Sequence, residues 1–227
     1  MSNRNWKLSP SDFAFLWEEC KRCFYLKVVS GFPRPRSIMA TIFKIIDNEM
    51  NKYFSGKRLE NIIPGFPAGV VEYGENWVES QPISFPDKNS TCFIKGRFDT
   101  VIKFDDGNYG VIDFKTSQRR SEHIPLYARQ LHAYAYALEN AGPGKLSIAP
   151  ITKLGLLVYE PDRFSADRID SALLSGAISW IKIPRNNDTF FEFLGEVMSV
   201  LEQPSPPGGS PSCEWCRYRD TSRRTGL

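Results

Sequence analysis

The sequence contains no apolar run close to the roughly 20 residues that a membrane-spanning helix needs, and residues 1–10 have no hydrophobic signal segment. We therefore expect a cytoplasmic protein with no membrane partner. A glycine-rich phosphate-binding loop is also absent, so any helicase or ATPase activity must come from a partner. Histidine is scarce: His123 and His132 are the only two, and a lone helical histidine such as His132 is more often partly buried than catalytic.

The net charge is small, and cysteines are few. A formal net charge of +3 permits nucleic-acid binding without arguing for it. In the cytoplasm the five cysteines are expected to be thiols or metal ligands, because disulfides are kept reduced there. At 227 residues, with 41% hydrophobic residues, the chain can bury one large core, so we predict a single domain with a metal-binding tail at residues 204–227.

Apolar periodicity predicts an α/β fold with an α+β character, in which helices flank a central mixed sheet. The predicted strands lie in the β-rich stretch 68–116, where a turn at residues 105–108 joins strand 93–104 to strand 109–115, and at 153–160 and 178–183. Helices are predicted at residues 9–21, 38–54, 126–140 and 189–201. The first has a strong start, with Ser9 as N-cap, Pro10 at the first helical position and Asp12 placed for a capping box. Residues 204–211, rich in Pro, Gly and Ser, form a linker.

Two aspartates and a lysine are the first candidate site. Side chains alternate along a strand, so Asp113 and Lys115 share one face while Phe114 faces a core. Asp99, across the predicted hairpin, can bring a second carboxylate to the same place. Two carboxylates, the backbone carbonyl of Phe114 and water form the oxygen-rich shell that Mg²⁺ or Mn²⁺ prefers, and Lys115 can orient the water or stabilise the transition state. The alternative is an exposed hairpin with a solvated Asp–Lys pair.

Gln130 and Tyr134 favour the site over the exposed pair, because they lie four residues apart on one face of the next predicted helix. Three motifs together resemble those of the PD-(D/E)XK nuclease superfamily: Gly96-Arg97-x-Asp99, Asp113-x-Lys115 and Gln130-x-x-x-Tyr134. Within the superfamily the motifs most resemble those of the RecB-like branch. This branch includes the CRISPR-associated exonucleases of the fourth Cas family and the nuclease domains of helicase–nuclease repair complexes.

The resemblance implies a restriction-endonuclease-like core. It implies that Asp99 and Asp113 hold the metal, that Lys115 assists catalysis, and that Gln130 and Tyr134 shape the site and contact DNA. We expect Arg97, inside the first motif, to contact DNA as well. RecB-like members usually carry a further metal-ligating histidine in the helix before the sheet. Here Lys44 falls at that position, and Asp47 or Glu49 can substitute, unless both simply face solvent on an amphipathic helix.

Four cysteines form two pairs at metal-ligand spacing, Cys20-x-x-Cys23 and Cys213-x-x-Cys216. We predict that they form one four-thiolate site that clips the N- and C-terminal segments together; the alternative is four buried, idle thiols. Zinc and an iron–sulfur cluster both accept four thiolates, so the residues leave both open. Iron–sulfur members of the RecB-like branch clip their termini around a [4Fe–4S] cluster, with one early and three late cysteines. That resemblance favours the cluster over Zn²⁺, although the two-plus-two split here departs from it.

The flanking tail is basic and aromatic, so Arg217 and Arg219 are candidate DNA contacts. Cys92 is predicted to be an ordinary core residue. The leading hypothesis is a metal-dependent deoxyribonuclease, an exonuclease on single strands or duplex ends, in CRISPR adaptation or in DNA repair, with CRISPR integrase or helicase subunits as partners. The alternative is a catalytically weak or inactive nucleic-acid-binding module of the same fold. A zinc-ribbon-like interaction protein ranks last, because it leaves the hairpin residues unused.

Overall fold

The computed structural model describes residues 4–35, 40–117 and 123–225. Before the first long strand the chain is mostly helical, in this order: β1 (Asn5–Leu8), α1 (Pro10–Ala14), α2 (Leu16–Glu19), α3 (Lys21–Val29), α4 (Thr41–Phe54) and the short 3₁₀ helix η1 (Leu59–Asn61). Six strands follow: β2 (Gly69–Tyr73), β3 (Asn76–Glu79), β4 (Ile83–Ser84), β5 (Thr91–Phe98), β6 (Thr100–Phe104) and β7 (Tyr109–Thr116). The remaining elements are α5 (Ile124–Glu139), β8 (Ile151–Arg168), β9 (Ser171–Ile183), α6 (Asn187–Leu201) and α7 (Glu214–Thr225).

The strands form two mixed sheets flanked by helices, which confirms the predicted fold class. The larger sheet has the order β2-β6-β7-β8-β9, with β7 and β8 parallel and the other pairs antiparallel. In the smaller sheet β5 pairs with β1 in parallel and with β3 and β4 in antiparallel fashion. The chain passes from one sheet to the other between β5 and β6, at Asp99.

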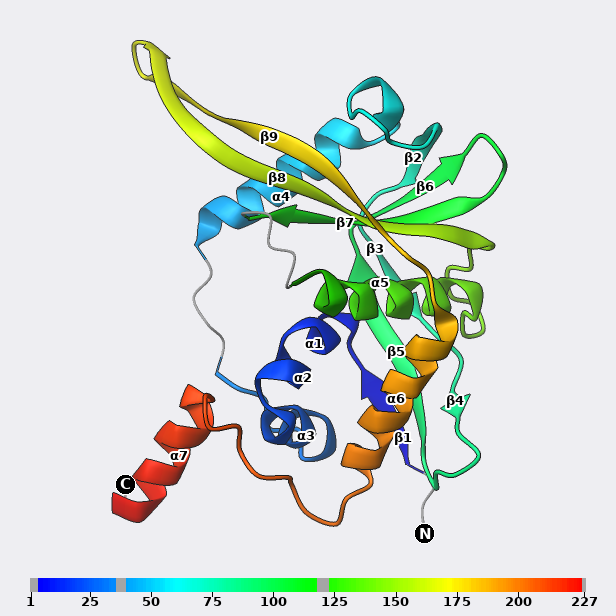
Figure 1. Ribbon diagram of the computed structural model, residues 1–227, viewed down its shortest axis with the longest axis vertical. Helices are drawn as coiled ribbons and strands as arrows, with labels where there is room; N and C mark the ends of the chain where they lie inside the picture. Colours follow the sequence, from blue (N-terminus) through cyan, green and yellow to red (C-terminus); the bar gives the residue numbers. More distant parts are fainter. Residues whose placement is uncertain (1–3, 36–39, 118–122, 226–227) are drawn as a thin grey trace.

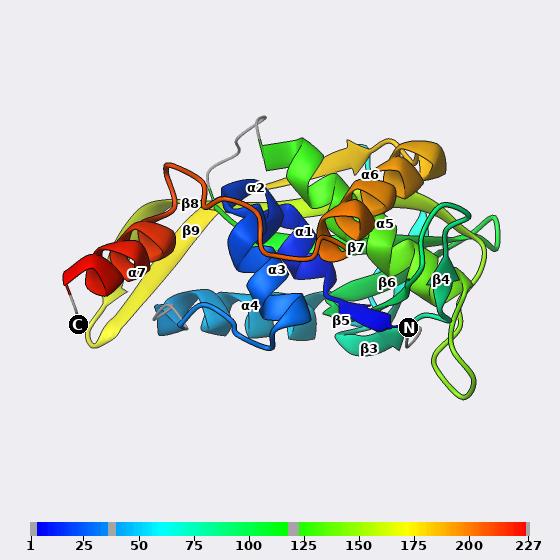
Figure 2. The ribbon, with the colours of Figure 1, turned by 90° about the horizontal axis from the view of Figure 1, so that it is seen from below.

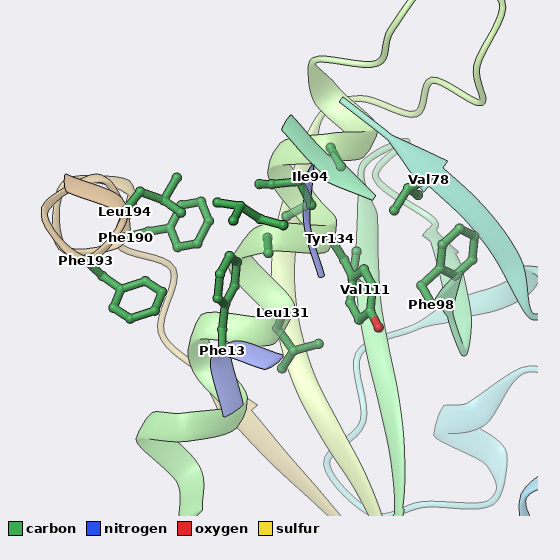
Figure 3. Close-up of a cluster of buried hydrophobic side chains, with 14 of the residues drawn as sticks. Phe13, Val78, Ile94, Phe98, Val111, Leu131, Tyr134, Phe190, Phe193 and Leu194 are labelled. Carbon is green, nitrogen blue, oxygen red and sulfur yellow. The ribbon is translucent and has the colours of Figure 1, made fainter. Parts of the chain in front are cut away.

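Each face of the larger sheet packs against a different helix. Figures 1 and 2 show α4 on one side of the strands and α5 on the other. On the α4 side, Phe54 packs with Ile112 and Phe114. On the α5 side, Val111 and Leu131 belong to a larger core that also includes side chains of α1 and α6 (Figure 3). Consecutive residues of β7 therefore face different cores, as strand alternation predicts.

The predicted first helix is broken into three. It begins at Pro10 as predicted, but the Ser9 side chain makes no capping bond, and Asp12 binds Lys27 through both carboxylate oxygens at 2.6 Å instead. Cys20 has an extended backbone (φ −167°, ψ 105°) that interrupts the helix, and α3 then runs on to Val29. Cys20 and Cys23 reach the same cluster in this arrangement.

The other elements differ from the prediction mainly in length. The predicted strand 93–104 is two strands, because the chain changes sheets at Asp99. Predicted helix 38–54 is described from Thr41; its residues 38 and 39 lie outside the described residues. The tail contains a helix, α7, that the sequence did not predict.

Strands β8 and β9 form a long arm that extends past the end of β7 (Figure 1). The predicted strand ended at residue 160, and the next residue is Pro161, which lacks the N–H that continues a ladder. In the structure a register shift between Pro161 and Arg163 accommodates the proline, and the pairing continues to Arg168. Near the tip, Phe164 is 71% exposed and Ile169 is 94% exposed. Among the described residues, no helix is long and apolar enough to cross a membrane.

Candidate active site and cysteine site

Strand β7 positions Asp113 and Lys115 on the face that packs against α5. Asp113 is 2% exposed, between two residues that pack in the α4-side core. Lys115 forms an ion pair with Asp113, and its ammonium lies 4.9 Å from the ring centroid of Tyr127 on α5. Burial alone would lower the pKa of Lys115, but the charges of Asp113 and Asp99 outweigh it and raise the pKa. The lysine is therefore held protonated beside the carboxylates.

Asp99 lies at the junction of β5 and β6, where the two sheets meet. Its carboxylate accepts a hydrogen bond from the backbone N–H of Phe114 at 2.7 Å, which fixes it to β7. Burial, and next the negative charge of Asp113, raise the pKa of Asp99 well above its ordinary value of 3.8. The structure thus brings the two predicted carboxylates together, and the charge of Asp113 opposes the ionisation of Asp99.

Helix α5 holds Asp113 from the other side. The Gln130 amide donates to Asp113 Oδ1 at 3.1 Å and to the Tyr134 hydroxyl at 3.3 Å. The Tyr134 ring lies in the core beside Val111, with its hydroxyl at the edge of the cluster (Figure 3). Gly96 leaves room for this close packing, since a Cβ there would lie 2.7 Å from Cδ of Pro10 and 3.2 Å from the ring of Tyr134. The predicted Gln130–Tyr134 face is thereby brought onto the hairpin.

Of the two acidic candidates on α4, the structure places Asp47 within electrostatic reach of Asp113 and leaves Glu49 outside the site. Burial, then the charges of Glu75 and Asp113, raise the pKa of Asp47. Glu49 instead pairs with Lys52 at 2.7 Å, and both side chains are largely exposed. Lys44, at the position of the family histidine, is exposed.

Glu75 and Tyr127 were missed by the sequence analysis. Glu75 lies in the turn between β2 and β3 and pairs with Arg97 at 2.5 Å. No sequence spacing identifies Glu75 as a site residue, because the antiparallel register of β3 on β5 brings it next to Arg97. In that position its negative charge raises the pKa of Asp47. Tyr127 lies seven residues before Tyr134 on the same helix, a spacing that could have marked it as part of the same face.

The charges around this centre do not balance. Asp47, Asp99, Asp113 and Glu75 contribute four carboxylates to one electrostatic neighbourhood, and Lys115 and Arg97 contribute two cations. The surplus of two negative charges, and the raised pKa of Asp99, suit a divalent cation with oxygen ligands. By donor chemistry and by charge, the residues present fit Mg²⁺ or Mn²⁺.

The four predicted cysteines lie together in the structure, buried, with their sulfur atoms within 4.8 Å of one another. Sγ of Cys216 lies 3.6 Å from Sγ of Cys20 and 3.6 Å from that of Cys23. Cys23 and Cys213 are 3.7 Å apart. The segments that supply them, at the start of α3 and at the start of α7, are far apart in the sequence, and the four-cysteine group could hold a metal. We call this group the cysteine clip.

Arginines surround the clip. Arg34 donates to Cys213 Sγ at 3.3 Å, and Arg219 donates to Cys216 Sγ at 3.5 Å. Two guanidinium groups offset the charge of −2 that four thiolates leave around a divalent ion. The predicted DNA contact Arg219 therefore has a partner within the clip, whereas Arg217 is exposed on α7.

The remaining candidates stay outside both sites. Cys92 is buried in β5, where burial raises the pKa of its thiol to about 12. His132 donates from Nδ1 to the carbonyl of Ala128 at 2.7 Å if its Nε2 accepts the 2.8 Å bond from Asn186 N–H. This neutral ring joins α5 to the start of α6, and burial lowers its pKa.

Two aspartates and a lysine lie where the two sheets meet, and the side-chain amide of Gln130 on α5 holds one of the aspartates. Such a site suits a divalent metal ion. The sequence matches the PD-(D/E)XK nuclease superfamily over residues 52–221, which is most of the chain, and the chain belongs to this superfamily. No curated protein matches the sequence. The crystal structure of SSO0001 is similar, with 20% sequence identity, a TM-score of 0.47, and coverage of 88% of this chain and 78% of that one.

Proposed function

We propose that the protein is a Mg²⁺- or Mn²⁺-dependent nuclease that hydrolyses phosphodiester bonds in DNA. One observation carries the proposal: the buried Asp113 carboxylate lies between Lys115 and the Gln130 amide, beside a second carboxylate whose pKa is raised. A structural ion pair between Asp113 and Lys115 has no need of a second, buried acid whose ionisation Asp113 opposes. A site that must bind a divalent cation does need a second carboxylate.

Each residue has a task in this proposal. A bound divalent ion would lower the pKa of a water molecule and neutralise charge on the phosphate. Asp113, Asp99 and the Phe114 carbonyl would hold it. Lys115, kept protonated, would stabilise the charge that develops on the phosphate oxygens. Gln130 keeps Asp113 in one orientation, and Tyr134 in turn supports Gln130.

The nuclease proposal is tested on labelled single-stranded and duplex DNA, with Mg²⁺, with Mn²⁺ and with EDTA. We expect cleavage that requires the metal and that falls by about 10²- to 10³-fold in Lys115→Ala, since this variant loses one charge that stabilises the transition state. Lys115→Ala purified in the same way controls for contaminating nucleases. If wild-type protein cleaves no faster than this variant with Mn²⁺, the binding-module alternative replaces the nuclease.

We also propose that Asp47 takes the place of the histidine that RecB-like members carry on this helix. Asp47→Ala is expected to weaken the apparent affinity for Mn²⁺ in the cleavage assay by at least the 10- to 100-fold that outer-shell substitutions typically cost. Glu49→Ala is the matched control, since Glu49 lies on the same helix and pairs with Lys52 in solvent. Equal Mn²⁺ dependence of the two variants would remove Asp47 from the ligand set.

For the cysteine clip we propose a single zinc ion. Four thiolates at about 2.3 Å from one tetrahedral ion stand about 3.8 Å apart, and the three measured separations of 3.6, 3.6 and 3.7 Å are close to this value. In a [4Fe–4S] cluster each thiolate binds a different iron, so the sulfurs stand farther apart. The resemblance to iron–sulfur relatives favours the cluster, whereas the sulfur–sulfur distances favour zinc, and we follow the distances.

We also propose that the protein belongs to the RecB-like branch and is an exonuclease on single strands or duplex ends. The order of the motifs and the clip between distant segments support this placement. Because the sequence has no phosphate-binding loop, unwinding would come from helicase subunits in repair, or the protein would act with an integrase in CRISPR adaptation. Cleavage products from strands labelled at the 5′ or the 3′ end separate exonuclease from endonuclease action.

A further inference from the structure

A cleft of about 510 Å³ opens beside the candidate active site, and the proposed function does not use it. It lies between β1, α1 and α3 on one side and β3 and β5 on the other, and we call it the N-terminal cleft. Tyr134 lines it. Because Tyr134 binds Gln130, and Gln130 binds Asp113, the cleft lies two hydrogen bonds from the catalytic carboxylate.

Cations outnumber carboxylates in the lining of the N-terminal cleft. Four of its side chains are cations and one is a carboxylate: Lys7, Lys27, Lys95, Arg97 and Asp12. Three of these four cations pair with a carboxylate, Lys27 with Asp12, Lys95 with Glu79 and Arg97 with Glu75, so one positive charge is left over. A cleft lined mainly by cations can attract an anion such as a phosphodiester strand.

The cations differ in how they are paired. Lys27 is bound to Asp12 inside the cleft. Lys95 pairs with Glu79 at 2.6 Å, and that glutamate lies outside the lining. Lys7 is exposed and forms no ion pair among the residues that the structure describes. Lys7 can therefore bind a phosphate without breaking an existing ion pair.

An aromatic side chain lies among these charges. Trp77 on β3, opposite Arg97 in the register with β5, lines the cleft and is 58% exposed. An indole exposed in a basic groove is a platform on which a nucleobase can stack. Bases offer a free face only where the strand is single, because in a duplex both faces are covered by neighbouring bases.

We propose that the N-terminal cleft binds the single-stranded nucleic acid next to the scissile phosphate, with a base stacked on Trp77 and backbone phosphates on Lys7 and Lys95. This inference rests on the proposed nuclease function and names its substrate as single-stranded. It also gives the strand a path along β1, β3 and β5 to Tyr134, in place of the tail around Arg219, whose guanidinium binds a clip sulfur.

The test is fluorescence anisotropy of a labelled oligothymidylate of about 15 nucleotides, measured with the full chain in EDTA so that no cleavage occurs. Trp77→Ala is expected to weaken binding by at least about 5-fold, and Trp77→Phe to restore most of it, because phenylalanine can still stack. Lys7→Gln is expected to reduce the slope of log affinity against log salt by about 0.7, the contribution of one phosphate contact on a single strand.

Matched controls are Phe164→Ala, another exposed aromatic residue on a strand, and Lys182→Gln, another exposed lysine. Both should bind like wild type. If Trp77→Ala also binds like wild type, or if Trp215→Ala on α7 weakens binding and Trp77→Ala does not, the cleft proposal is wrong. Duplex bound as tightly as the single strand would overturn it too.

The same measurement separates this inference from the nuclease proposal. A chain that binds through Trp77 but never cleaves DNA with Mn²⁺ would refute the nuclease and leave the cleft as a single-strand binding site. Metal-dependent cleavage together with binding that is indifferent to Trp77 and Lys7 would refute the cleft alone.

Discussion

Asp99→Asn is expected to abolish metal-dependent cleavage and, in the absence of divalent ions, to raise the melting temperature. The substitution removes a charge that burial and Asp113 oppose, and an asparagine oxygen can still accept the hydrogen bond from Phe114 N–H. Each unit by which the pKa is raised costs about 1.4 kcal/mol once the group is ionised. For a chain of this size, about 1 kcal/mol corresponds to about 2–4 °C in melting temperature, whereas cleavage should fall by at least about 10³-fold.

The gain in stability should depend on pH. The pKa of Asp99 is raised in the folded protein above the 3.8 of a free aspartate, so between these two values the folded state binds more protons than the unfolded state. The contribution of Asp99 to the free energy of unfolding therefore falls as pH rises from about 4 through the folded pKa of this group. Asp99→Asn lacks this slope, so its advantage should be absent near pH 4 and largest at pH 8. Thermal unfolding in EDTA across this range measures it.

Added Mn²⁺ should make the wild type more stable than Asp99→Asn. The wild type gains about 2.7 kcal/mol at a concentration of 100 times Kd, and Asp99→Asn gains less because it has lost a ligand. Asp105→Asn is the control, because the pKa of Asp105 is lowered by Arg58 and its removal brings no gain. Should Asp99→Asn melt below the wild type at pH 8 in EDTA, burial and Asp113 would not oppose the ionisation of Asp99 as described.

Local patterns predicted the parts of the site that lie on single elements. Strand alternation put Asp113 and Lys115 on one face and Phe114 on the other, and helical spacing put Gln130 beside Tyr134. These relations depend only on backbone geometry over a few residues, so a sequence suffices to state them.

Relations between distant segments could not be predicted in the same way. Asp47 and Glu49 are two residues apart on one amphipathic helix, and only the packing of α4 on the sheet separates a half-buried acid from an exposed one. Glu75 reaches the site through the register of β3 on β5. The change of sheet at Asp99 was missed because apolar alternation continues on both sides of it.

For the cysteines, spacing predicted the two pairs and the clip, while their separation in space bears on the metal. A tetrathiolate site needs only four cysteines at suitable spacing, whichever metal binds. The sulfur–sulfur distances are tertiary quantities, since Cys23 and Cys213 are 190 residues apart in the chain.

Loss of the cysteine clip is expected to be the most destabilising single change considered for this protein. A cross-link that closes a loop of about 100 residues contributes about 4.7 kcal/mol in the chain-entropy view of disulfides, and the loop between Cys23 and Cys213 is longer. Cys216→Ala, which removes one ligand of four, should therefore lower the melting temperature by about 10–20 °C. Residues 204–211 should become the first site of proteolysis, because α7 is then no longer held.

Cys92→Ala is the matched control, because it removes a buried thiol that lies outside the clip. It should keep one zinc per chain by elemental analysis and lose far less stability than Cys216→Ala, which should lose the zinc. A brown wild-type protein with iron and a broad band near 400 nm would replace zinc by the cluster while leaving the clip in place. A metal-held cross-link cannot be lost without lowering the stability that it confers. If the wild-type protein holds no metal, and if Cys216→Ala melts at the same temperature as Cys92→Ala, then packing alone joins α3 to α7.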